Sequence, residues 1–497
     1  MDVSCAEIKS ISTIKDSVTL IRVDHSFQSF FSHPRHSHPP LDLLYIQSGL
    51  REIGFDACLI DMWVSRQSIG QVLQTVLSTH PKFAIIKAYT WCIHVSLELG
   101  RLLRKKDVIT IAVGQHVNHA SVLWEENATF KNNWLQAFDF SIHGAPELEC
   151  PRLIKKLFFK QPGKNSSAII YQQFSTNHIV SLSQPEHLSY PQFTDKMMKA
   201  YAFPFPVASL RGIKKWAYVQ TSWGCPYGCL HCSGAVRKSF GKTHYKRNPT
   251  QVIDEIIFHI QKGAQAICFE DDALFADKRH IQALCDAMMQ QHINIPWMAH
   301  ARPDELDETT LKKATHCGLK LLKIGVESGA KKQIEIIGKA RSGKKWIEQV
   351  RHIFPILHHL NIASIAMFMI GTPGETSEDI KRSILLAREI LPDYVQVQIF
   401  TPYPDTPYYQ HLPQVDRKEI NRMPSYHYHR CQWSAARMSK KNVSRYQIHF
   451  YRLFYLRTNY MLQFLKKNKD LFKQRSFLTD AFKSFINKRV KEIWRTR

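Results

Sequence analysis

Short hydrophobic runs alternate with segments of helical periodicity along the first 160 residues. Five of these runs are almost entirely apolar, which is typical of strands buried on both faces of a parallel sheet. Helical patterns lie between them, as at 41–53 and 92–105. The alternation predicts an α/β fold over 1–160, with a doubly wound, Rossmann-like parallel sheet that binds ligands beyond the carboxyl ends of its strands. The five expected strands are V-T-L-I-R-V (18–23), F-D-A-C-L-I (55–60), F-A-I-I-K-A (83–88), V-I-T-I-A-V (108–113) and F-D-F-S-I (138–142).

The periodicity weakens over 161–215, where Q-P-G-K-N-S-S, S-Q-P and F-P-F-P indicate a connecting region. It returns over 216–410 as six further runs with helical stretches between them. Asn248-Pro249 and Asp277 mark two helix starts. Six β-α units predict a partial (β/α)6 barrel of the TIM type, with its active site on the loops that follow the strands. The six runs are 216–222, 265–270, 297–301, 319–327, 363–370 and 394–400.

Composition and charge narrow the class of protein. A chain of 497 residues with 44% hydrophobic positions can bury more than one core. No apolar run reaches the ~18 residues of a membrane span, and the first residues lack the pattern of a secretory signal, so we expect a cytoplasmic protein. The formal charge is +25, and 431–497 hold seventeen Lys or Arg against three Asp or Glu. We expect a basic, helical C-terminal region over 411–497, suited to an acidic partner.

Three of the eleven cysteines lie together in W-G-C-P-Y-G-C-L-H-C (223–232), immediately after the first expected barrel strand. A structural zinc site needs four ligands, and the nearest candidates for the fourth are His231 and His244. The alternative is a [4Fe-4S] cluster held by three thiolates, which leaves one iron open to another ligand.

The spacing of Cys225, Cys229 and Cys232 resembles the C-x3-C-x-aromatic-C signature of the radical S-adenosylmethionine (SAM) enzymes, with His231 in the aromatic position. The resemblance implies a [4Fe-4S] cluster on these thiolates whose open iron binds SAM. It also implies reductive cleavage of SAM to methionine and a 5'-deoxyadenosyl radical, which takes a hydrogen atom from an unactivated carbon. A reducing electron donor, such as a flavodoxin or ferredoxin, would supply the electron.

Four later turns match the same family in order, each at the end of an expected strand. By the resemblance, F-E-D-D (269–272) contacts the SAM amino group, and helix capping is the alternative for its aspartates. Arg302 would bind the SAM carboxylate as a bidentate donor. G-V-E-S-G (325–329) would contact the ribose, and I-G-T-P-G-E-T (370–376) would approach adenine or the methionyl end. The cofactor-binding candidates on these turns are Glu270, Asp271, Asp272, Arg302, Glu327, Ser328, Gly371 and Gly374.

Residues 1–160 resemble the cobalamin (B12)-binding domain that precedes the barrel in one large class of these enzymes. V-G-Q-H (113–116) and H-G-A-P-E (143–147) would supply the corrin contacts, Gly114 and Gly144. Gln115 and Ala145-Pro146 depart from the glycine-rich pattern of that class, and the cobalt-ligating D-x-H-x-x-G motif is absent. The histidines of H-P-R-H-S-H (33–38) are interpreted as loop residues. H-F-Y-R-L-F-Y-L-R (449–457) resembles a segment that follows the barrel in this class, which includes hopanoid methylases and anaerobic magnesium-protoporphyrin cyclases.

The resemblance implies a cobalamin-dependent methylase of an unactivated carbon that acts on a small molecule, anionic or lipid-like. The alternative is a radical SAM oxidoreductase or cyclase acting on a tetrapyrrole or lipid-like substrate, with or without cobalamin. A nucleic-acid-binding protein with a structural metal would use the basic tail, but it would not explain the ordered turns. For the tail, an aromatic stripe over 446–465 predicts packing against the barrel. A peripheral contact of 466–497 with anionic lipid is the second hypothesis.

Overall fold

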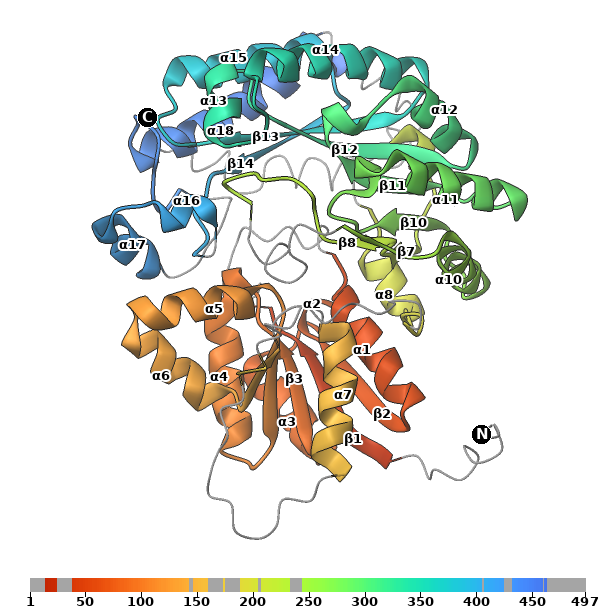
Figure 1. Ribbon diagram of the computed structural model, residues 1–497, viewed down its shortest axis with the longest axis vertical. Coiled ribbons are helices and arrows are strands. Elements are labelled where there is room, and N and C mark those ends of the chain that lie inside the picture. The colour runs from red at the N-terminus through yellow and green to blue at the C-terminus, as the bar shows by residue number, and fades with distance from the viewer. Residues whose placement is uncertain are drawn as a thin grey trace.

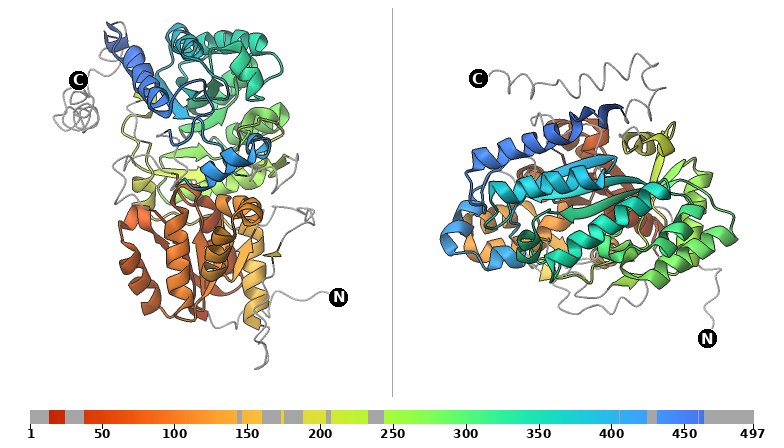
Figure 2. Two further views of the ribbon diagram at one scale, coloured as in Figure 1. Left: turned by 90° about the vertical axis from the view of Figure 1, so that its left-hand side faces the viewer. Right: turned by 90° about the horizontal axis from the view of Figure 1, so that it is seen from above.

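The protein has two lobes, a lower one built on the N-terminal sheet and an upper one built on the barrel strands (Figure 1). The computed structural model describes residues 14–24, 38–142, 146–159, 173–174, 188–203, 207–232, 244–404, 406–423, 431–458 and 460–462. Figure 2 shows the same two lobes from the side and from above.

The lower lobe contains one parallel sheet in the order β2-β1-β3-β4-β5-β6. Its strands are β1 (Ile14–Arg22), β2 (Phe55–Asp61), β3 (Phe83–Lys87), β4 (Ile109–Val113), β5 (Phe140–Ile142) and β6 (Gln173–Phe174). The five predicted strands and the doubly wound order are confirmed. The two-residue β6 comes from the connecting region, where the apolar pattern was too weak to predict it.

Helices cover both faces of this sheet because its central strands β3 and β4 are buried on both sides. One core joins the sheet to α1 and α7, through residues such as Leu43 and Ile154. The other core joins it to α3, α4 and α6, through residues such as Val72, Leu99 and Trp134. The helices of this lobe are α1 (Leu41–Glu52), α2 (Met62–Ser65), α3 (Ile69–Ser78), α4 (Ile93–Arg104), α5 (Gln115–Glu126), α6 (Ala128–Ala137) and α7 (Pro146–Phe159).

The upper lobe is an open barrel of six parallel strands in the order β14-β13-β12-β11-β10-β7. The predicted partial (β/α)6 barrel is therefore confirmed, strand for strand. Its strands are β7 (Trp216–Val219), β10 (Ala266–Phe269), β11 (Trp297–Ala301), β12 (Leu319–Glu327), β13 (Ala363–Ile370) and β14 (Tyr394–Ile399). Their connecting helices are α10 (Pro249–Gln261), α11 (Lys278–Gln290), α12 (Glu308–His316), α13 (Lys331–Ile336), α14 (Gly343–His359) and α15 (Ser377–Ile390).

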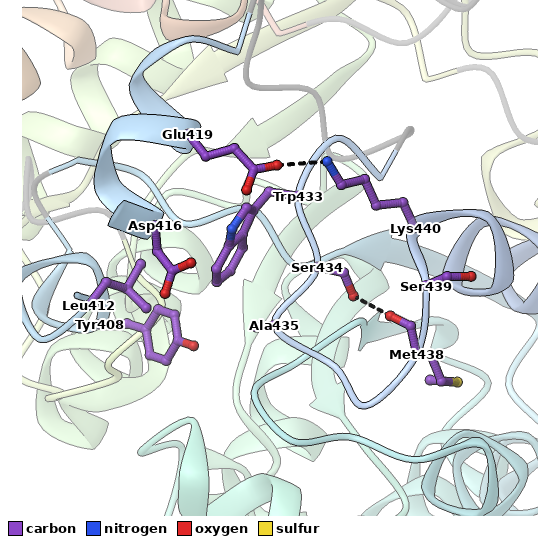
Figure 3. A pocket seen from close by; sticks show the side chains of 10 residues that line it. All are labelled: Tyr408, Leu412, Asp416, Glu419, Trp433, Ser434, Ala435, Met438, Ser439 and Lys440. Carbon is purple, nitrogen blue, oxygen red and sulfur yellow. Dashed lines mark hydrogen bonds and ion pairs between the residues drawn. The ribbon is translucent and has the colours of Figure 1, made fainter. Parts of the chain in front are cut away.

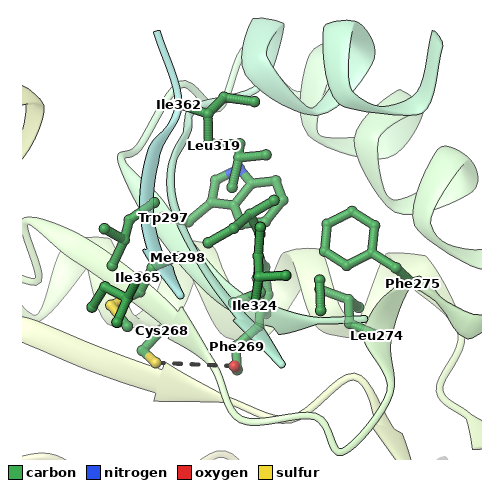
Figure 4. Packing of buried hydrophobic residues seen from close by; sticks show 14 of the residues in the cluster. Cys268, Phe269, Leu274, Phe275, Trp297, Met298, Leu319, Ile324, Ile362 and Ile365 are labelled. Carbon is green, nitrogen blue, oxygen red and sulfur yellow. Dashed lines mark hydrogen bonds between the residues drawn. The ribbon is translucent and has the colours of Figure 1, made fainter. Parts of the chain in front are cut away.

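Local signals start the barrel helices where the sequence predicts. Asn248 caps α10 with Pro249 in its first turn, and Asp277 caps α11. Figure 4 shows part of the apolar packing of this lobe, in which Ile324 lies with Trp297 and Phe275. The smaller elements are α8 (Asp195–Ala200), β8 (Ser222–Trp223), β9 (Tyr245–Lys246), α16 (Pro407–Gln410) and α17 (Gln414–Asn421).

Helix α18 (Lys440–Tyr455) covers β14, which is the outer strand of the barrel sheet. The Tyr451 and Tyr455 hydroxyls accept from the backbone N–H groups of Val397 and Val395 at 2.9 and 3.0 Å. The same hydroxyls donate back to the carbonyls of these two residues. Two tyrosines one helical turn apart thus replace the ladder partners of an edge strand, which would otherwise be open to pairing.

The apolar stripe of the tail packs on the barrel, as the first of the two tail hypotheses predicts. Phe450 and Phe454 are fully buried in the barrel core. The segment 466–497, on which the lipid hypothesis rests, lies outside the described residues. No helix in the described part of the chain is long and apolar enough to cross a membrane.

The two lobes meet through buried polar contacts. Glu255 of α10 pairs with Arg247 at 2.5 Å and accepts from Tyr45 of α1 at 3.0 Å. Both charged side chains of this pair are almost completely buried. The contacting residues of the lower lobe lie near the carboxyl ends of its strands, so this edge of the sheet faces the barrel (Figure 1).

We predict that the double variant Tyr451→Phe with Tyr455→Phe will expose the backbone of β14. Each lost hydrogen bond contributes about 1 kcal/mol, so local opening should become several times more frequent. Hydrogen exchange measured by mass spectrometry should show faster exchange over 394–399. Tyr446→Phe is the matched control, because the Tyr446 hydroxyl makes no hydrogen bond among the described residues. Unchanged exchange in the double variant would show that the helix covers this strand by packing alone.

Candidate functional site

The three clustered cysteines lie on a loop that two other segments of the barrel lobe hold in place. The Leu230 N–H donates to the carbonyl of Ile337 at 2.9 Å, and the Leu230 carbonyl accepts from the Tyr408 N–H at 3.1 Å. Gly338 adopts a positive φ of 64° beside this loop, and a Cβ there would lie 3.0 Å from the Leu230 side chain. The loop therefore has a fixed path at the carboxyl end of the barrel.

The side chain of Arg302, at the end of β11, contacts two residues of the cysteine loop. Its guanidinium lies 3.7 Å from the centre of the Tyr227 ring and donates toward the Cys229 sulfur at 3.5 Å. It also forms a bidentate pair with Asp304, at 2.9 and 2.8 Å. The sequence predicts that Arg302 binds a carboxylate, and here that carboxylate is its neighbour. Its contact with SAM stays a prediction.

The three thiols influence one another. Burial, together with the nearby Cys229, Asp272 and Cys225, raises the pKa of Cys232 to about 12. Burial is also the main cause of the raised pKa of Cys225. Cys232 nevertheless reaches solvent. Iron would remove these protons, because a bound cation stabilises the thiolate.

The geometry argues against the zinc alternative. Ligands of a single Zn²⁺ must converge to about 2.3 Å from one point. Within the described residues, no three His, Cys, Asp or Glu side chains converge in this way. The two candidates for the fourth ligand have other partners: His231 lies 3.4 Å from the Ile337 carbonyl, and His244 lies 3.0 Å from the Ser222 hydroxyl. A [4Fe-4S] cluster fits the donor set better, because its thiolates bind different irons and need not converge.

Asp271, on the turn after β10, braces the start of the cysteine loop. Its buried carboxylate accepts from the Thr221 N–H at 3.1 Å, the Thr221 hydroxyl at 2.8 Å and the Ser222 hydroxyl at 2.5 Å. Burial raises the pKa of Asp271 to about 6. Neither Asp271 nor Asp272 caps a helix, so the capping alternative is wrong for these two residues; α11 is capped by Asp277.

Asp272 faces the cysteine loop. Its side chain reaches solvent, yet burial among protein atoms raises its pKa to about 7, with the charges of Asp271 and Glu270 adding to the effect. Asp272 is therefore well placed for a cationic ligand group near the thiols, as its predicted contact with the SAM amino group requires.

Glu270 has a partner from the other lobe. Its carboxylate lies 2.6 Å from Nδ1 of His38 and 3.2 Å from the Cys268 sulfur. Burial alone would raise the pKa of Glu270, but His38, His300 and Lys323 outweigh it and hold the pKa well below its usual range. His38 is the last histidine of the H-P-R-H-S-H run, and the others lie outside the described residues. Nothing in the local sequence signals a contact between residues 232 positions apart.

Glu327 ends β12 in a strained conformation. Its φ is 68°, in the left-handed region that non-glycine residues rarely adopt, and the register of β12 on β13 shifts at this point. Its carboxylate pairs with Lys339 at 2.8 Å. Burial would raise its pKa, but Lys339 and His231 outweigh burial and lower it. Glu327 is thus held as a carboxylate beside the cysteine loop, and the sequence did not reveal its partner Lys339.

Ser328, Gly371 and Gly374 determine the shape of the turns in which they lie. The buried Ser328 hydroxyl bonds to the Ser383 hydroxyl at 3.2 Å and accepts from the Ala330 N–H at 3.1 Å. These partners do not favour its predicted contact with a ribose. Gly371 and Gly374 have positive φ values of 79° and 67°, which explains the glycines. A Cβ at Gly374 would meet open space, so a ligand can approach its backbone.

Glu375 holds this turn from within, and the sequence did not single it out. Its carboxylate accepts from the Gly371 N–H at 2.5 Å and from the Thr372 N–H at 3.3 Å. The side chain is fully buried, and burial raises its pKa to about 8 despite these hydrogen bonds.

Gly114, one of the two predicted corrin contacts, lies at the carboxyl edge of the lower sheet. Gly114 follows β4 with a φ of 98°, and a Cβ there would lie 3.3 Å from the Lys87 side chain. Its own packing thus requires a glycine. Gly144 lies outside the described residues. Near this edge the buried Thr90 hydroxyl has no hydrogen-bond partner in the described part of the chain.

A separate pocket of about 570 Å³ lies in the C-terminal part of the upper lobe (Figure 3). Tyr408 and Trp433 line it together with residues of α17 and the start of α18. None of its lining residues is a predicted cofactor contact. Tyr408 links the pocket to the cysteine loop, because its N–H donates to the Leu230 carbonyl.

The barrel lobe matches a known family model, that of the radical SAM superfamily, over residues 219–387. This segment contains the three cysteines, the strand-end turns through Glu375 and the helices between them. Residues 219–387 form a radical SAM domain. The resemblance deduced from the cysteine spacing is thereby confirmed, and the protein carries the domain of an enzyme superfamily.

Sequence relatives extend beyond the radical SAM domain. An uncharacterized methyltransferase of Pyrococcus horikoshii is 26% identical over 381 residues, which cover 74% of this chain and 77% of the relative. The anaerobic magnesium-protoporphyrin IX monomethyl ester cyclase of Rubrivivax gelatinosus is 22% identical over 276 residues. That alignment covers 55% of this chain and 48% of the cyclase.

Solved structures share the fold of both lobes. The radical SAM methyltransferase TsrM of Kitasatospora setae, solved with cobalamin and a [4Fe-4S] cluster, superposes with a TM-score of 0.61 at 14% identity. The match covers 80% of this chain and 78% of TsrM. The cobalamin-dependent radical SAM enzyme OxsB, solved with aqua-cobalamin, gives a TM-score of 0.57 at 17% identity, over 81% of this chain and 56% of OxsB. The two-lobed α/β architecture is thus that of cobalamin-dependent radical SAM enzymes.

We predict that the stability of the Glu375→Gln variant, compared with that of the wild type at the same pH, will increase as the pH rises. The folded pKa of about 8 exceeds the ordinary value of 4.5, so the contribution of Glu375 to stability is complete below about pH 4.5 and is lost as the pH rises through 8. Glutamine keeps an acceptor for the two N–H groups and does not ionise. The difference in Tm, variant minus wild type, should therefore grow from about pH 5 to about pH 8.

The exposed residue Glu389, which pairs with Arg351, provides the control variant Glu389→Gln. Its Tm difference should not widen over this range. A constant difference for Glu375→Gln as well would show that Glu375 is ionised throughout.

Proposed function

We propose that the protein is a cobalamin-dependent radical SAM enzyme that methylates an unactivated carbon. The single observation that carries the proposal is the loop with three thiols at the carboxyl end of the barrel, ringed by strand-end carboxylates and glycine turns in the order that the family uses. The matching radical SAM domain and the shared architecture of TsrM and OxsB support it.

Cys225, Cys229 and Cys232 would hold a [4Fe-4S] cluster through their thiolates. Bound there, the cluster would supply one electron for the cleavage of SAM to methionine and a 5'-deoxyadenosyl radical. The protein's part is to fix the thiols: Asp271 braces the start of the loop, Arg302 spans it, and Ile337 and Tyr408 hold its Leu230. The electron would come from a reducing donor such as a flavodoxin or ferredoxin.

The strand-end residues would bind SAM. Asp272 is placed for a cationic amino group, and Glu327 for two hydroxyl donors such as those of a ribose. Gly374 offers an open backbone for close approach. Arg302 would reach a SAM carboxylate only by sharing or exchanging its present partner, Asp304. Ser328 contributes to the shape of the turn.

Cobalamin would lie between the lobes, above the carboxyl edge of the lower sheet and near Gly114. When bound, it would carry the methyl group that is transferred to the substrate. The structural likeness to two enzymes solved with cobalamin supports cobalamin as a cofactor of this fold. Thr90, with an unsatisfied buried hydroxyl near that edge, is a candidate contact.

A radical SAM oxidoreductase or cyclase is the second candidate, favoured by the cyclase among the sequence relatives. The two functions differ in what they do with SAM. Methylation uses SAM both as radical source and as methyl donor, so S-adenosylhomocysteine forms beside 5'-deoxyadenosine. A cyclase forms 5'-deoxyadenosine without S-adenosylhomocysteine. A peripheral membrane contact through 466–497 stays a prediction for either function.

We predict that the anaerobically reconstituted, cobalamin-loaded and reduced protein forms both products from SAM, as measured by mass spectrometry. Cys229→Ala should form neither, because two thiolates cannot hold the cluster. Cys58→Ala is the control, since Cys58 is exposed in the lower lobe, and it should behave as wild type. Retention of both products in Cys229→Ala would overturn the proposal. 5'-Deoxyadenosine alone in the wild type would favour the oxidoreductase or cyclase.

We predict that Glu327→Gln weakens SAM binding by about tenfold or more without reducing the iron content. The carboxylate accepts charge-assisted hydrogen bonds that the amide cannot replace at equal strength. Equilibrium dialysis with labelled SAM and iron analysis of the same sample would measure both quantities. Glu389→Gln, remote and exposed, should change neither. If SAM affinity is unchanged in Glu327→Gln, the role of Glu327 is to pair with Lys339 alone.

A further inference from the structure

Lys323 lies on the inner face of the barrel, in the middle of β12. Side chains of a strand alternate between its two faces. Ile324, the next residue, packs in the apolar cluster with Phe275 and Trp297 (Figure 4). Lys323 therefore points the other way, into the barrel. Its register partner on β11 is His300, and Glu270 follows the next strand, β10.

The ammonium group of Lys323 is buried without a direct anionic partner. The residue is only 3% exposed. Among the residues that the structure describes, its ammonium makes no hydrogen bond and no ion pair. The centre of the Phe203 ring lies 6.0 Å from this ammonium group. A buried charge is costly unless it is paired and hydrogen-bonded, so an anion bound beside Lys323 would stabilise its ammonium group.

The neighbouring titratable groups do not neutralise the charge of Lys323. Glu270 attracts Lys323 from a distance, but its carboxylate is in contact with His38 of the other lobe. Burial and the charge of Lys323 together lower the pKa of His300 to about 3. His300 is therefore a neutral imidazole at pH 7, able to donate one N–H but not to neutralise a cation.

We propose that Lys323, with His300 beside it, binds an anionic group of the substrate inside the barrel, a carboxylate or a phosphate. The proposal rests on the proposed function only in naming the occupant as the substrate. Lys323 precedes Glu327 by four residues, which is about 13 Å of strand. An anion held there lies deeper along the strand than a SAM ribose held by Glu327. The anionic group of the substrate would thus lie below that ribose contact, level with His300 on the neighbouring strand.

The test uses the full-length, reconstituted protein and simple anions as probes. Thermal unfolding is followed in rising concentrations of inorganic phosphate or acetate, with chloride keeping the ionic strength constant. The variants are Lys323→Met, which removes the charge at similar volume, and Lys323→Arg, which keeps it. Lys320→Met is the matched control, because Lys320 lies at the start of the same strand and is partly exposed.

One of the two anions should raise the Tm of the wild type, of Lys320→Met and of Lys323→Arg. For Lys323→Met the apparent Kd of that anion should rise by about tenfold or more. In chloride alone Lys323→Met should melt above the wild type, because it lacks an uncompensated buried charge. If Lys323 only supported the fold, Lys323→Met would melt below the wild type.

Equal anion effects in Lys323→Met and wild type would overturn the proposal, as would the lack of any effect in the wild type. A loss of SAM affinity in Lys323→Met as large as the loss of phosphate or acetate affinity would also overturn it, since the anion would then be the SAM carboxylate. None of these measurements needs SAM cleavage. Failure of the proposed function would therefore appear in the assay of 5'-deoxyadenosine, and failure of this inference would appear in the anion series.

Discussion

Every strand of the two large sheets runs parallel to its neighbours, and this constraint determines where chemistry can occur. Parallel strands deliver their last residues to the same edge, so turns that are far apart in sequence meet in space. In the barrel, this edge collects the cysteine loop, Asp272, Glu327 and the Gly371–Gly374 turn. The lower sheet has the same property, and its carboxyl edge faces the barrel. The carboxyl ends of both sheets thus face the boundary between the lobes.

The interface between the lobes depends on buried polar contacts as well as on apolar packing. Arg247, Glu255 and Tyr45 form a fully enclosed group across the lobes. Arg247 and Glu255 both belong to the barrel lobe, so the group crosses between the lobes through Tyr45, which donates a hydrogen bond to Glu255. A buried hydroxyl left without its acceptor typically costs about 1–3 kcal/mol, which makes the relative placement of the lobes specific. Glu126 of α5 adds a second contact, to Tyr409 and Arg417 beyond the barrel strands. Contacts of this kind fix the lobes relative to one another.

The sequence predicts the architecture well because the relevant signals are local. Apolar runs locate eleven of the described strands, and Asn248 and Asp277 begin their helices as expected. The cysteine spacing locates the domain that the family comparison matches. What the sequence did not predict are partners distant in the chain: His38 on Glu270, Lys339 on Glu327, and the hydroxyls of Tyr451 and Tyr455 on β14. Glu375 was missed for another reason. A carboxylate in a glycine-rich turn is expected to be exposed, but Glu375 is buried and accepts hydrogen bonds from the backbone N–H groups of that turn.

The central claim is that the three thiols hold an iron–sulfur cluster whose open iron binds SAM. Electron paramagnetic resonance of the reduced, reconstituted protein tests it most directly, with spectra recorded before and after SAM is added. The account predicts the signal of a reduced [4Fe-4S] cluster, with g values that change when SAM binds to the open iron. A cluster signal that SAM leaves unchanged, or a protein that takes up zinc and shows no cluster signal, would contradict it.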